Sequence, residues 1–192
     1  MFYVFSKAVP PDICEQITRD CKQNTLEEAK VFKFDKSGRN NPSIRKSSVC
    51  FIRDKDDKIN KLVWDFLRKA NEAQFNYDLK YFQAVQFAEY KVGDFFGWHQ
   101  DQTGISPSNE IRKLSATLVL SDPDTFEGGE LQFYNGGRPM YTSKKDLELT
   151  ENDMKAQGSL IIFDSRDWHR VTPVTKGVRY SVVCWSSGQA FR

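Results

Sequence analysis

Two stretches near the N-terminus place apolar residues at helical spacing. Residues 13–23 follow two prolines and an aspartate, which are signals for the start of a helix. Within this stretch Ile13, Ile17 and Cys21 recur at every fourth position. Residues 55–75 carry a second pattern of the same period. Both stretches therefore predict amphipathic helices.

The rest of the chain carries strand-like patterns. Residues 34–48 contain Ser-Gly and Asn-Asn-Pro clusters that predict a loop, and a short strand is expected at 49–52. From residue 79 onward, β-prone runs alternate with Gly- and Pro-containing turns. The expected strands lie within residues 79–91, 113–121, 129–135, 158–165, 169–174 and 179–187. The polar segment 144–156 predicts an exposed loop or short helix.

The order of these patterns predicts the fold class. No helical pattern of comparable strength separates the later strands, which favours antiparallel sheet over βαβ units. We therefore expect a mainly β protein with N-terminal helices (α+β), built as a jelly roll or a similar double sheet. One domain is expected over residues 1–192, with helical support in 1–78 and the β core in 79–192.

Composition excludes several classes of protein. Apolar residues make up 39% of the 192 residues, which is typical of a globular chain rather than a disordered one. A formal net charge of +2 gives no reason to expect a nucleic-acid or membrane partner. The four cysteines form no CxxC pair, and the sequence shows no signal peptide and no apolar run long enough for a bilayer. These features predict a cytoplasmic, reducing setting.

Both histidines of the chain fall into a pattern typical of a metal site. His99 and Asp101 form an H-x-D pair beside a predicted strand, and His169 lies beside another. Two histidines and one carboxylate, with further positions open, are the ligand set of non-haem Fe(II) oxygenases. An H-x-D pair alone is weak evidence, because most histidines are ordinary hydrogen-bonded residues.

Arg179 follows His169 by ten residues. An arginine on a neighbouring strand suits bidentate pairing with a carboxylate. A dicarboxylate that chelates iron would need such an anchor at its far end. The alternative is a surface arginine beside Lys176.

Three blocks of sequence resemble 2-oxoglutarate- and Fe(II)-dependent dioxygenases, most closely the prolyl-4-hydroxylase-like group and the bacterial PKHD-type hydroxylases. FAEYKVGDFFGWHQD resembles the first metal block, IRKLSATLVLSDPDTFEGGELQFYNG the following strand pair, and GSLIIFDSRDWHRVTPVTKGVRYSVVCW the distal block. IRKSSVCFI also resembles the Arg-x-Ser-Ser strand of prolyl 4-hydroxylases. The N-terminal third departs from the PKHD-type pattern.

The resemblance implies a double-stranded β-helix of the cupin-like jelly-roll type. It also implies Fe(II) and 2-oxoglutarate as cofactor and cosubstrate, with ascorbate as a further candidate. The implied metal ligands are His99, Asp101 and His169, and Arg179 would pair with the C5 carboxylate of 2-oxoglutarate. Tyr90 matches a tyrosine that lines the cosubstrate pocket. Trp185 matches a tryptophan beside the same pocket, although a plain core role explains it equally well.

The activity implied is hydroxylation with O2 and 2-oxoglutarate, giving succinate and CO2, on prolyl residues of a peptide or protein. Arg112, Trp98, Arg39 and Arg45 are candidate substrate-binding residues. As a hypothesis, residues 34–46 form a lid over the substrate; the alternative is a solvated surface loop. Other open readings are hydroxylation of another residue or of a free small molecule, and a jelly roll that binds metal or carbohydrate without redox chemistry. The ring nitrogens of the two histidines that do not face the metal are expected to donate to a carbonyl or carboxylate.

Overall fold

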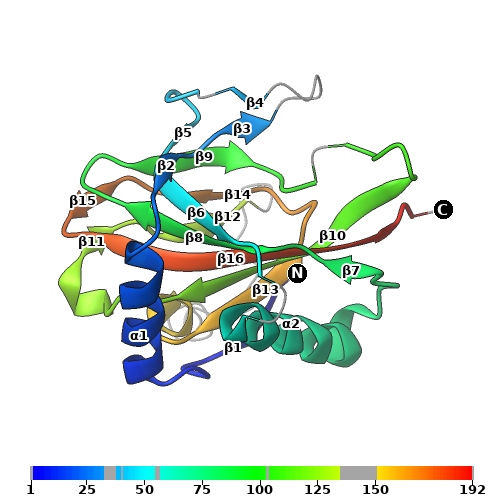
Figure 1. Cartoon of the computed structure of the whole chain (residues 1–192), viewed down its shortest axis with the longest axis horizontal. Helices are drawn as coiled ribbons and strands as arrows, with labels where there is room; N and C mark the ends of the chain where they lie inside the picture. Colours follow the sequence, from blue (N-terminus) through cyan, green and yellow to red (C-terminus); the bar gives the residue numbers. More distant parts are fainter. Residues whose placement is uncertain are drawn as a thin grey trace.

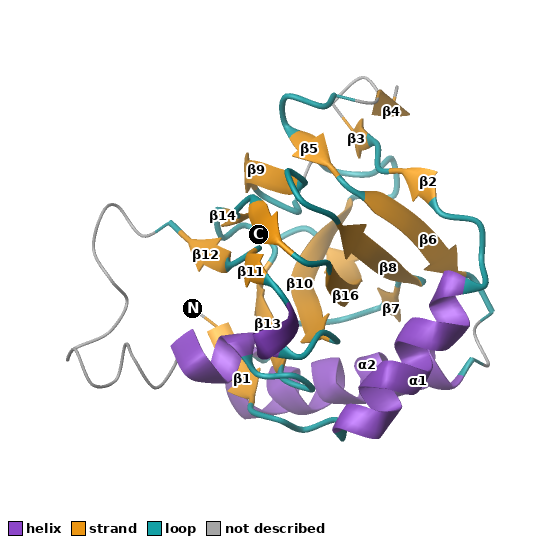
Figure 2. Cartoon of the chain, turned by 90° about the vertical axis from the view of Figure 1, so that its left-hand side faces the viewer, coloured by secondary structure: helices purple, strands orange, loops and turns teal. Residues whose placement is uncertain are grey.

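The computed structural model describes residues 2–32, 38–39, 41–54, 57–102, 104–134 and 151–191, and gives only the backbone for 31–32 and 38–39. Two antiparallel sheets dominate this part of the chain, and two helices cover one side (Figures 1 and 2). This arrangement agrees with the predicted helices followed by a double-sheet body.

The larger sheet has the strand order β1-β13-β10-β16-β8-β6-β2 within the described residues, and β7 pairs with β16 outside this path. Its strands are β1 (Phe2–Phe5), β2 (Glu27–Glu28), β6 (Ser48–Ile52), β7 (Tyr81–Phe82), β8 (Val85–Tyr90), β10 (Glu110–Val119), β13 (Leu160–Asp164) and β16 (Arg179–Gln189).

The smaller sheet has the order β12-β14-β9-β5. Its strands are β5 (Arg45–Lys46), β9 (Phe95–His99), β12 (Leu131–Phe133) and β14 (His169–Val171). Two further pairs join β11 (Glu127–Gly128) to β15 (Val174–Lys176) and β3 (Val31–Phe32) to β4 (Gly38–Arg39). A 3₁₀ turn spans Pro123–Thr125.

Alternation along the larger sheet separates its two faces. Alternate residues of β10, β13 and β16 pack with both helices in the main hydrophobic core, including Leu114, Leu118, Ile162 and Val182. The residues between them point toward the smaller sheet, since successive strand residues face opposite sides. The space between the sheets is therefore available for polar chemistry.

Helix α1 (Pro11–Lys22) begins where its two prolines and aspartate predict. Its buried face consists of Cys14, Ile17 and Cys21. Ile13, which the sequence pattern placed on this face, is 42% exposed. Cys14 takes the inward position one residue later.

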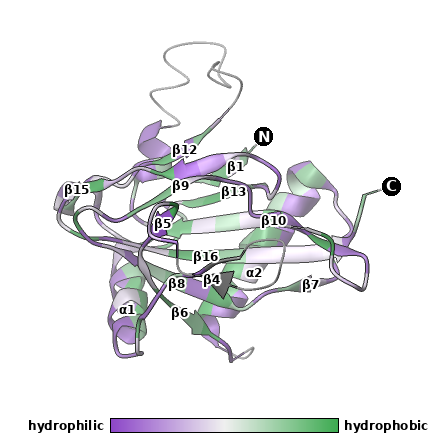
Figure 3. Cartoon of the chain, turned by 90° about the horizontal axis from the view of Figure 1, so that it is seen from above, coloured by the Kyte–Doolittle hydropathy of each residue, from purple (hydrophilic) through white to green (hydrophobic). Residues whose placement is uncertain are grey.

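Helix α2 (Lys58–Ala70) is capped at its N-terminus by Asp57, whose carboxylate accepts a hydrogen bond from the backbone N–H of Ile59 at 2.7 Å. Figure 3 shows hydrophobic and hydrophilic residues together on this helix. The helix continues into a π-helical turn, Asn71–Phe75. The predicted pattern over 55–75 thus corresponds to one helix and its π-helical extension. None of the helices in the described ranges is long and apolar enough to cross a membrane.

The predicted lid, residues 34–46, lies partly outside the described residues, which omit 33–37 and 40. At its C-terminal end, β5 pairs with β9, and Arg45 is only 7% exposed. The expectation of a solvated surface loop is therefore wrong for Arg45, because strand pairing places it between the sheets.

Asn60 connects α2 to the larger sheet. Its side chain is fully buried, donates to the carbonyls of Ile52 (2.9 Å) and Asp54 (2.6 Å), and accepts from the N–H of Val85 (2.9 Å). Asn60→Leu should therefore lower the free energy of unfolding by about 2–4 kcal/mol, because it removes three hydrogen bonds to the backbone, one of them to the buried N–H of Val85. Urea denaturation measures this, with the exposed neighbour change Lys58→Gln as control. Equal stabilities of the two variants would contradict the assigned role.

Candidate metal centre and cosubstrate pocket

A pocket lies between the two sheets, with about 460 Å³ of empty space that is partly open to solvent. The larger sheet contributes alternate residues of β8 and β16, such as Gln86, Tyr90 and Ser181. The smaller sheet contributes Phe96 and His169, among others. The pocket is thus lined by side chains that point away from the helix-covered core.

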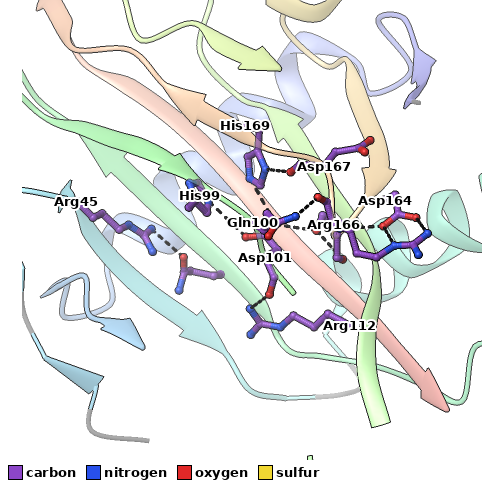
Figure 4. Close-up of polar contacts among 12 residues, drawn as sticks. Arg45, His99, Gln100, Asp101, Arg112, Asp164, Arg166, Asp167 and His169 are labelled. Carbon is purple, nitrogen blue, oxygen red and sulfur yellow. Dashed lines mark hydrogen bonds and ion pairs between the residues drawn. The ribbon is translucent and has the colours of Figure 1, made fainter. Parts of the chain in front are cut away.

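Strand pairing brings the two histidines together. His99 ends β9, His169 begins β14, and the two are Cα partners in the antiparallel pair. Asp101 lies two residues beyond the end of β9, so the chain bend after the strand, and not strand alternation alone, directs its carboxylate to the same point. The ligand atoms of all three side chains lie within 4.8 Å of one another (Figure 4). Among the described residues, this is the group that could hold a metal ion.

The orientation of both imidazoles suits metal binding. Nδ1 of His99 lies 2.8 Å from the carbonyl oxygen of Gly97, and Nδ1 of His169 lies 2.9 Å from that of Asp167. Each ring can therefore donate from Nδ1 and present the lone pair of Nε2 to a metal. The Nε2 atoms lie 3.4 and 3.6 Å from the carboxylate oxygens of Asp101.

The protonation states also suit a metal. Burial would by itself raise the pKa of Asp101, but His169, His99 and Arg112 hold that pKa well below its usual range. Burial lowers the pKa of His169. Both directions favour an ionised carboxylate and a neutral imidazole, which are the forms that coordinate cations.

Two serines that sequence reasoning missed fix the carboxylate. Ser115 on β10 donates from Oγ to Oδ2 of Asp101 at 2.7 Å, and Ser165 lies 2.9 Å from the same Ser115 hydroxyl. Both serines are at most 1% exposed. The inward alternation of KLSATLVLS was a signal for Ser115, but nothing in the sequence indicated its partner.

Arg179 lies at the β16 edge of the pocket without an acidic partner. It is 3% exposed, donates to Ser181 Oγ at 2.9 Å, and lies over the ring of Tyr90 at 5.5 Å. Burial lowers its pKa, yet a guanidinium remains charged in proteins. No carboxylate of the described residues forms an ion pair with it, so the pocket contains a buried cation that a bound anion would neutralise.

Trp185 lines another part of the pocket, and Arg112 lies beside it. The guanidinium of Arg112 lies 4.0 Å from the indole ring, and Trp185 is 8% exposed with Nε1 unpaired among the described residues. Arg112 also donates to the side chain of Gln83 at 2.9 Å. Trp185 thus borders the pocket as the resemblance implied, whereas Arg112 contacts Trp185 without belonging to the pocket lining. Among the described residues, no acceptor pairs with the indole N–H.

The remaining candidate substrate-binding residues differ in whether they line the pocket. Arg45 lines the pocket. Trp98 is 39% exposed, stacks under Arg170 at 4.7 Å, and does not belong to the pocket lining. Arg39 is placed in β4 by its backbone alone, and its side chain lies outside the described part. Of these three, only Arg45 is brought to the metal centre.

Comparison with known proteins agrees with this geometry. Residues 85–187 match the family described as the 2OG-Fe(II) oxygenase superfamily. This chain belongs to the 2OG-Fe(II) oxygenase superfamily. The matched range contains the histidine–aspartate–histidine group and Arg179, and the cofactors of the family, Fe(II) and 2-oxoglutarate, fit the donor set and the buried cation.

Curated relatives are similar to about half of the chain. A PKHD-type hydroxylase of Shewanella sp. (strain MR-7) is 38% identical over 101 residues, which are 52% of this chain and 40% of the relative. A PKHD-type hydroxylase of Pseudomonas putida (strain W619) is 36% identical over 101 residues, 50% of this chain and 40% of the relative. The match therefore spans about two fifths of the length of these relatives.

Solved structures share the fold. A Pseudomonas putida prolyl-4-hydroxylase aligns with a TM-score of 0.71 at 20% identity, covering 98% of this chain and 93% of the other. A viral collagen prolyl hydroxylase from Paramecium Bursaria Chlorella virus-1, in a 2OG complex, aligns at 0.69 with 16% identity, covering 97% and 96%. The predicted double-stranded β-helix is thereby confirmed.

In this oxygenase, Ser115→Ala should weaken Fe(II) binding about tenfold or more, because the carboxylate of Asp101 loses the hydroxyl that holds it. Anaerobic competition against a chelator measures the affinity directly. The control is Ser186→Ala, since the buried Ser186 hydroxyl has no partner among the described residues. Unchanged affinity in Ser115→Ala would show that the hydroxyl does not position the ligand.

Proposed function

We propose that the chain is a 2-oxoglutarate- and O2-dependent hydroxylase that uses His99, Asp101 and His169 to bind Fe(II) and Arg179 to bind the C5 carboxylate of 2-oxoglutarate. The observation that carries this proposal is the buried guanidinium of Arg179, which has no acidic partner among the described residues and lies in the same pocket as the three ligand side chains. A metal-binding jelly roll without redox chemistry would need the ligands but not this cation.

The chain's residues divide the work of such a reaction. Three side chains supply one face of a metal's coordination sphere and leave the other positions open to a cosubstrate and O2. Arg179, steadied by Ser181 and Tyr90, fixes the far end of the diacid. Bound Fe(II) and 2-oxoglutarate would supply oxidative decarboxylation to succinate and CO2, coupled to hydroxylation of a C–H bond.

Apolar side chains control access of water. Leu131, Val171, Val183 and Phe163 line the pocket around the ligands. Such a wall excludes solvent and other hydrogen donors from the reacting atoms. The target carbon must therefore be held by contacts at the remaining polar positions of the pocket.

A prolyl group in a peptide or protein is the substrate that the neighbours favour. The neighbours include prolyl hydroxylases. One, from Trichoplax adhaerens, is in complex with a hypoxia inducible factor oxygen degradation domain peptide fragment. It aligns with a TM-score of 0.70 at 15% identity, covering 96% of this chain and 82% of the other. Hydroxylation of another residue or of a free small molecule would use the same metal centre. Ascorbate would serve as a reductant for the iron, and a cytoplasmic setting would supply the Fe(II).

Arg179→Met tests the cosubstrate role. A buried unpaired charge destabilises the protein, so this variant should unfold at the same or higher temperature than wild type without ligand. Its affinity for 2-oxoglutarate should fall about 30-fold or more, since a lost buried charge pair is worth about 2 kcal/mol or more. Thermal shift with Mn(II) and 2-oxoglutarate measures both effects.

Arg166→Met is the matched control. Arg166 is hydrogen-bonded to Asp164, and this contact should stabilise the fold. The variant Arg166→Met should therefore lose stability and keep its response to 2-oxoglutarate. If Arg179→Met destabilises the ligand-free protein and keeps its response to 2-oxoglutarate, Arg179 is structural and the proposal is wrong.

Turnover tests the reaction itself. With Fe(II), ascorbate, air and 2-oxoglutarate, wild type should form succinate when proline-containing peptides are added, and the peptides should gain the mass of one oxygen atom. His169→Ala should abolish both, because the buried ligand on β14 is lost. Succinate formation that persists in His169→Ala would show that the distal ligand is wrongly assigned.

A further inference from the structure

We propose that Arg45 binds a carboxylate of the substrate, so that the substrate carries this group close to the carbon that is hydroxylated. The inference rests on the proposed function and narrows its substrate class. Its evidence is a second buried guanidinium without an acidic partner among the described residues.

Arg45 is held rigidly at the pocket wall. It is 7% exposed, donates from Nε to Ser47 Oγ at 2.9 Å, and donates from Nη2 to Oε1 of Gln86 at 3.0 Å. Its guanidinium lies 4.6 Å from the ring centroid of Phe96. Both acceptors are neutral, so they orient the group and leave its charge uncompensated.

The stack of rings places this charge near the metal centre. Phe96 lies parallel to the imidazole of His99, with 3.5 Å between ring centroids and 12° between planes. Arg45 is therefore one aromatic ring away from a ligand of the metal. Figure 4 shows its side chain pointing toward the ligand group.

2-Oxoglutarate cannot be the anion that Arg45 requires. In the proposed complex one carboxylate of 2-oxoglutarate binds the metal and the other binds Arg179. In addition, Arg45 contacts Gln86, and Arg179 contacts Tyr90. Gln86 and Tyr90 lie four residues apart on β8, which is about 13 Å along a strand. The two guanidinium groups thus serve different ends of the pocket.

Charge balance leads to the same conclusion. The charges of Fe(II) and Arg179 are balanced by those of Asp101 and the two carboxylates of 2-oxoglutarate. Arg45 is then a surplus buried cation, and one substrate carboxylate would neutralise it. Arg112 gives weaker evidence for a bound anion, because its side chain is partly exposed and solvent can compensate its charge.

A neutral peptide carbonyl is the main alternative occupant. It would add a hydrogen bond but no charge, and Ser47 and Gln86 already supply neutral acceptors. A carboxylate matches the fork of a guanidinium and compensates its charge. The carboxylate can come from a free amino acid, from the C-terminal residue of a peptide, or from an acidic side chain beside the target residue.

The test compares acids with their amides. Three series are used: free amino acids, proline included, and their amides; short peptides ending in the same residues and their C-terminal amides; and blocked peptides with Glu or Gln beside proline. Binding to wild type is measured by thermal shift with Mn(II) and 2-oxoglutarate, and succinate formation is measured with Fe(II) in air.

In one series the acid should bind about tenfold or more tightly than its amide, and that series identifies the source of the carboxylate. Arg45→Gln should remove the preference, and Arg45→Lys should retain part of it. Arg68→Gln, a change of an exposed arginine on α2, should preserve the preference. An unchanged response of Arg45→Gln to 2-oxoglutarate shows that its fold and cosubstrate end are intact.

Two results would overturn the proposal: equal binding of acids and amides in all three series, or an acid preference that survives in Arg45→Gln. These results are distinct from failure of the hydroxylase function. Amides that turn over as well as acids remove the role of Arg45 and leave the hydroxylase. Acids that bind through Arg45 without any succinate formation remove the hydroxylase and leave the carboxylate site.

Discussion

The pairing of β9 with β14 is the contact on which the rest of the site depends. It sets His99 opposite His169 and allows both Nδ1 atoms to reach backbone carbonyls. The register of this pair shifts between His169 and Val171. Because of this irregularity Phe96 and His99 both face the pocket, although they are three positions apart in the sequence. A regular strand would turn one of them to the outer surface.

The larger sheet supplies stability and polarity on opposite faces. Its helix-covered face packs apolar side chains of the main core, and burial of such groups stabilises by about 25 cal/mol for each Å² removed from water. The opposite face carries Arg179, Gln86 and Ser115, whose burial between the two sheets costs free energy. In the ligand-free protein, apolar burial on one face of the sheet therefore offsets the free-energy cost of a preorganised, positively charged site on the other face.

The sequence predicted those parts of the site that depend on residue type and long patterns. The two helices and the main strands follow from periodicity, and the candidate metal ligands follow from the two histidines and the H-x-D pair. The position of Arg45 did not, because β5 has only two residues and carries no periodicity, so only its pairing with β9 shows that the side chain is buried. β1 was missed for a related reason: its apolar run shows no alternation, and its pairing with β13 decides its structure.

The buried charges also distinguish the fold that this chain shares with its structural neighbours from the pocket side chains of this chain. Proteins only 15–20% identical to this chain share its fold, so the fold alone does not determine the pocket side chains. Within this frame, the proposed metal ligands and Arg179 would account for Fe(II) and 2-oxoglutarate, and the charges of this group would cancel in the complex. Arg45 is not needed for that balance, yet the protein buries it beside Phe96 against a considerable desolvation cost. Because Arg45 has no acidic partner among the described residues, the proposed substrate carboxylate would supply the compensating charge, and we expect binding to depend on the charge of the substrate.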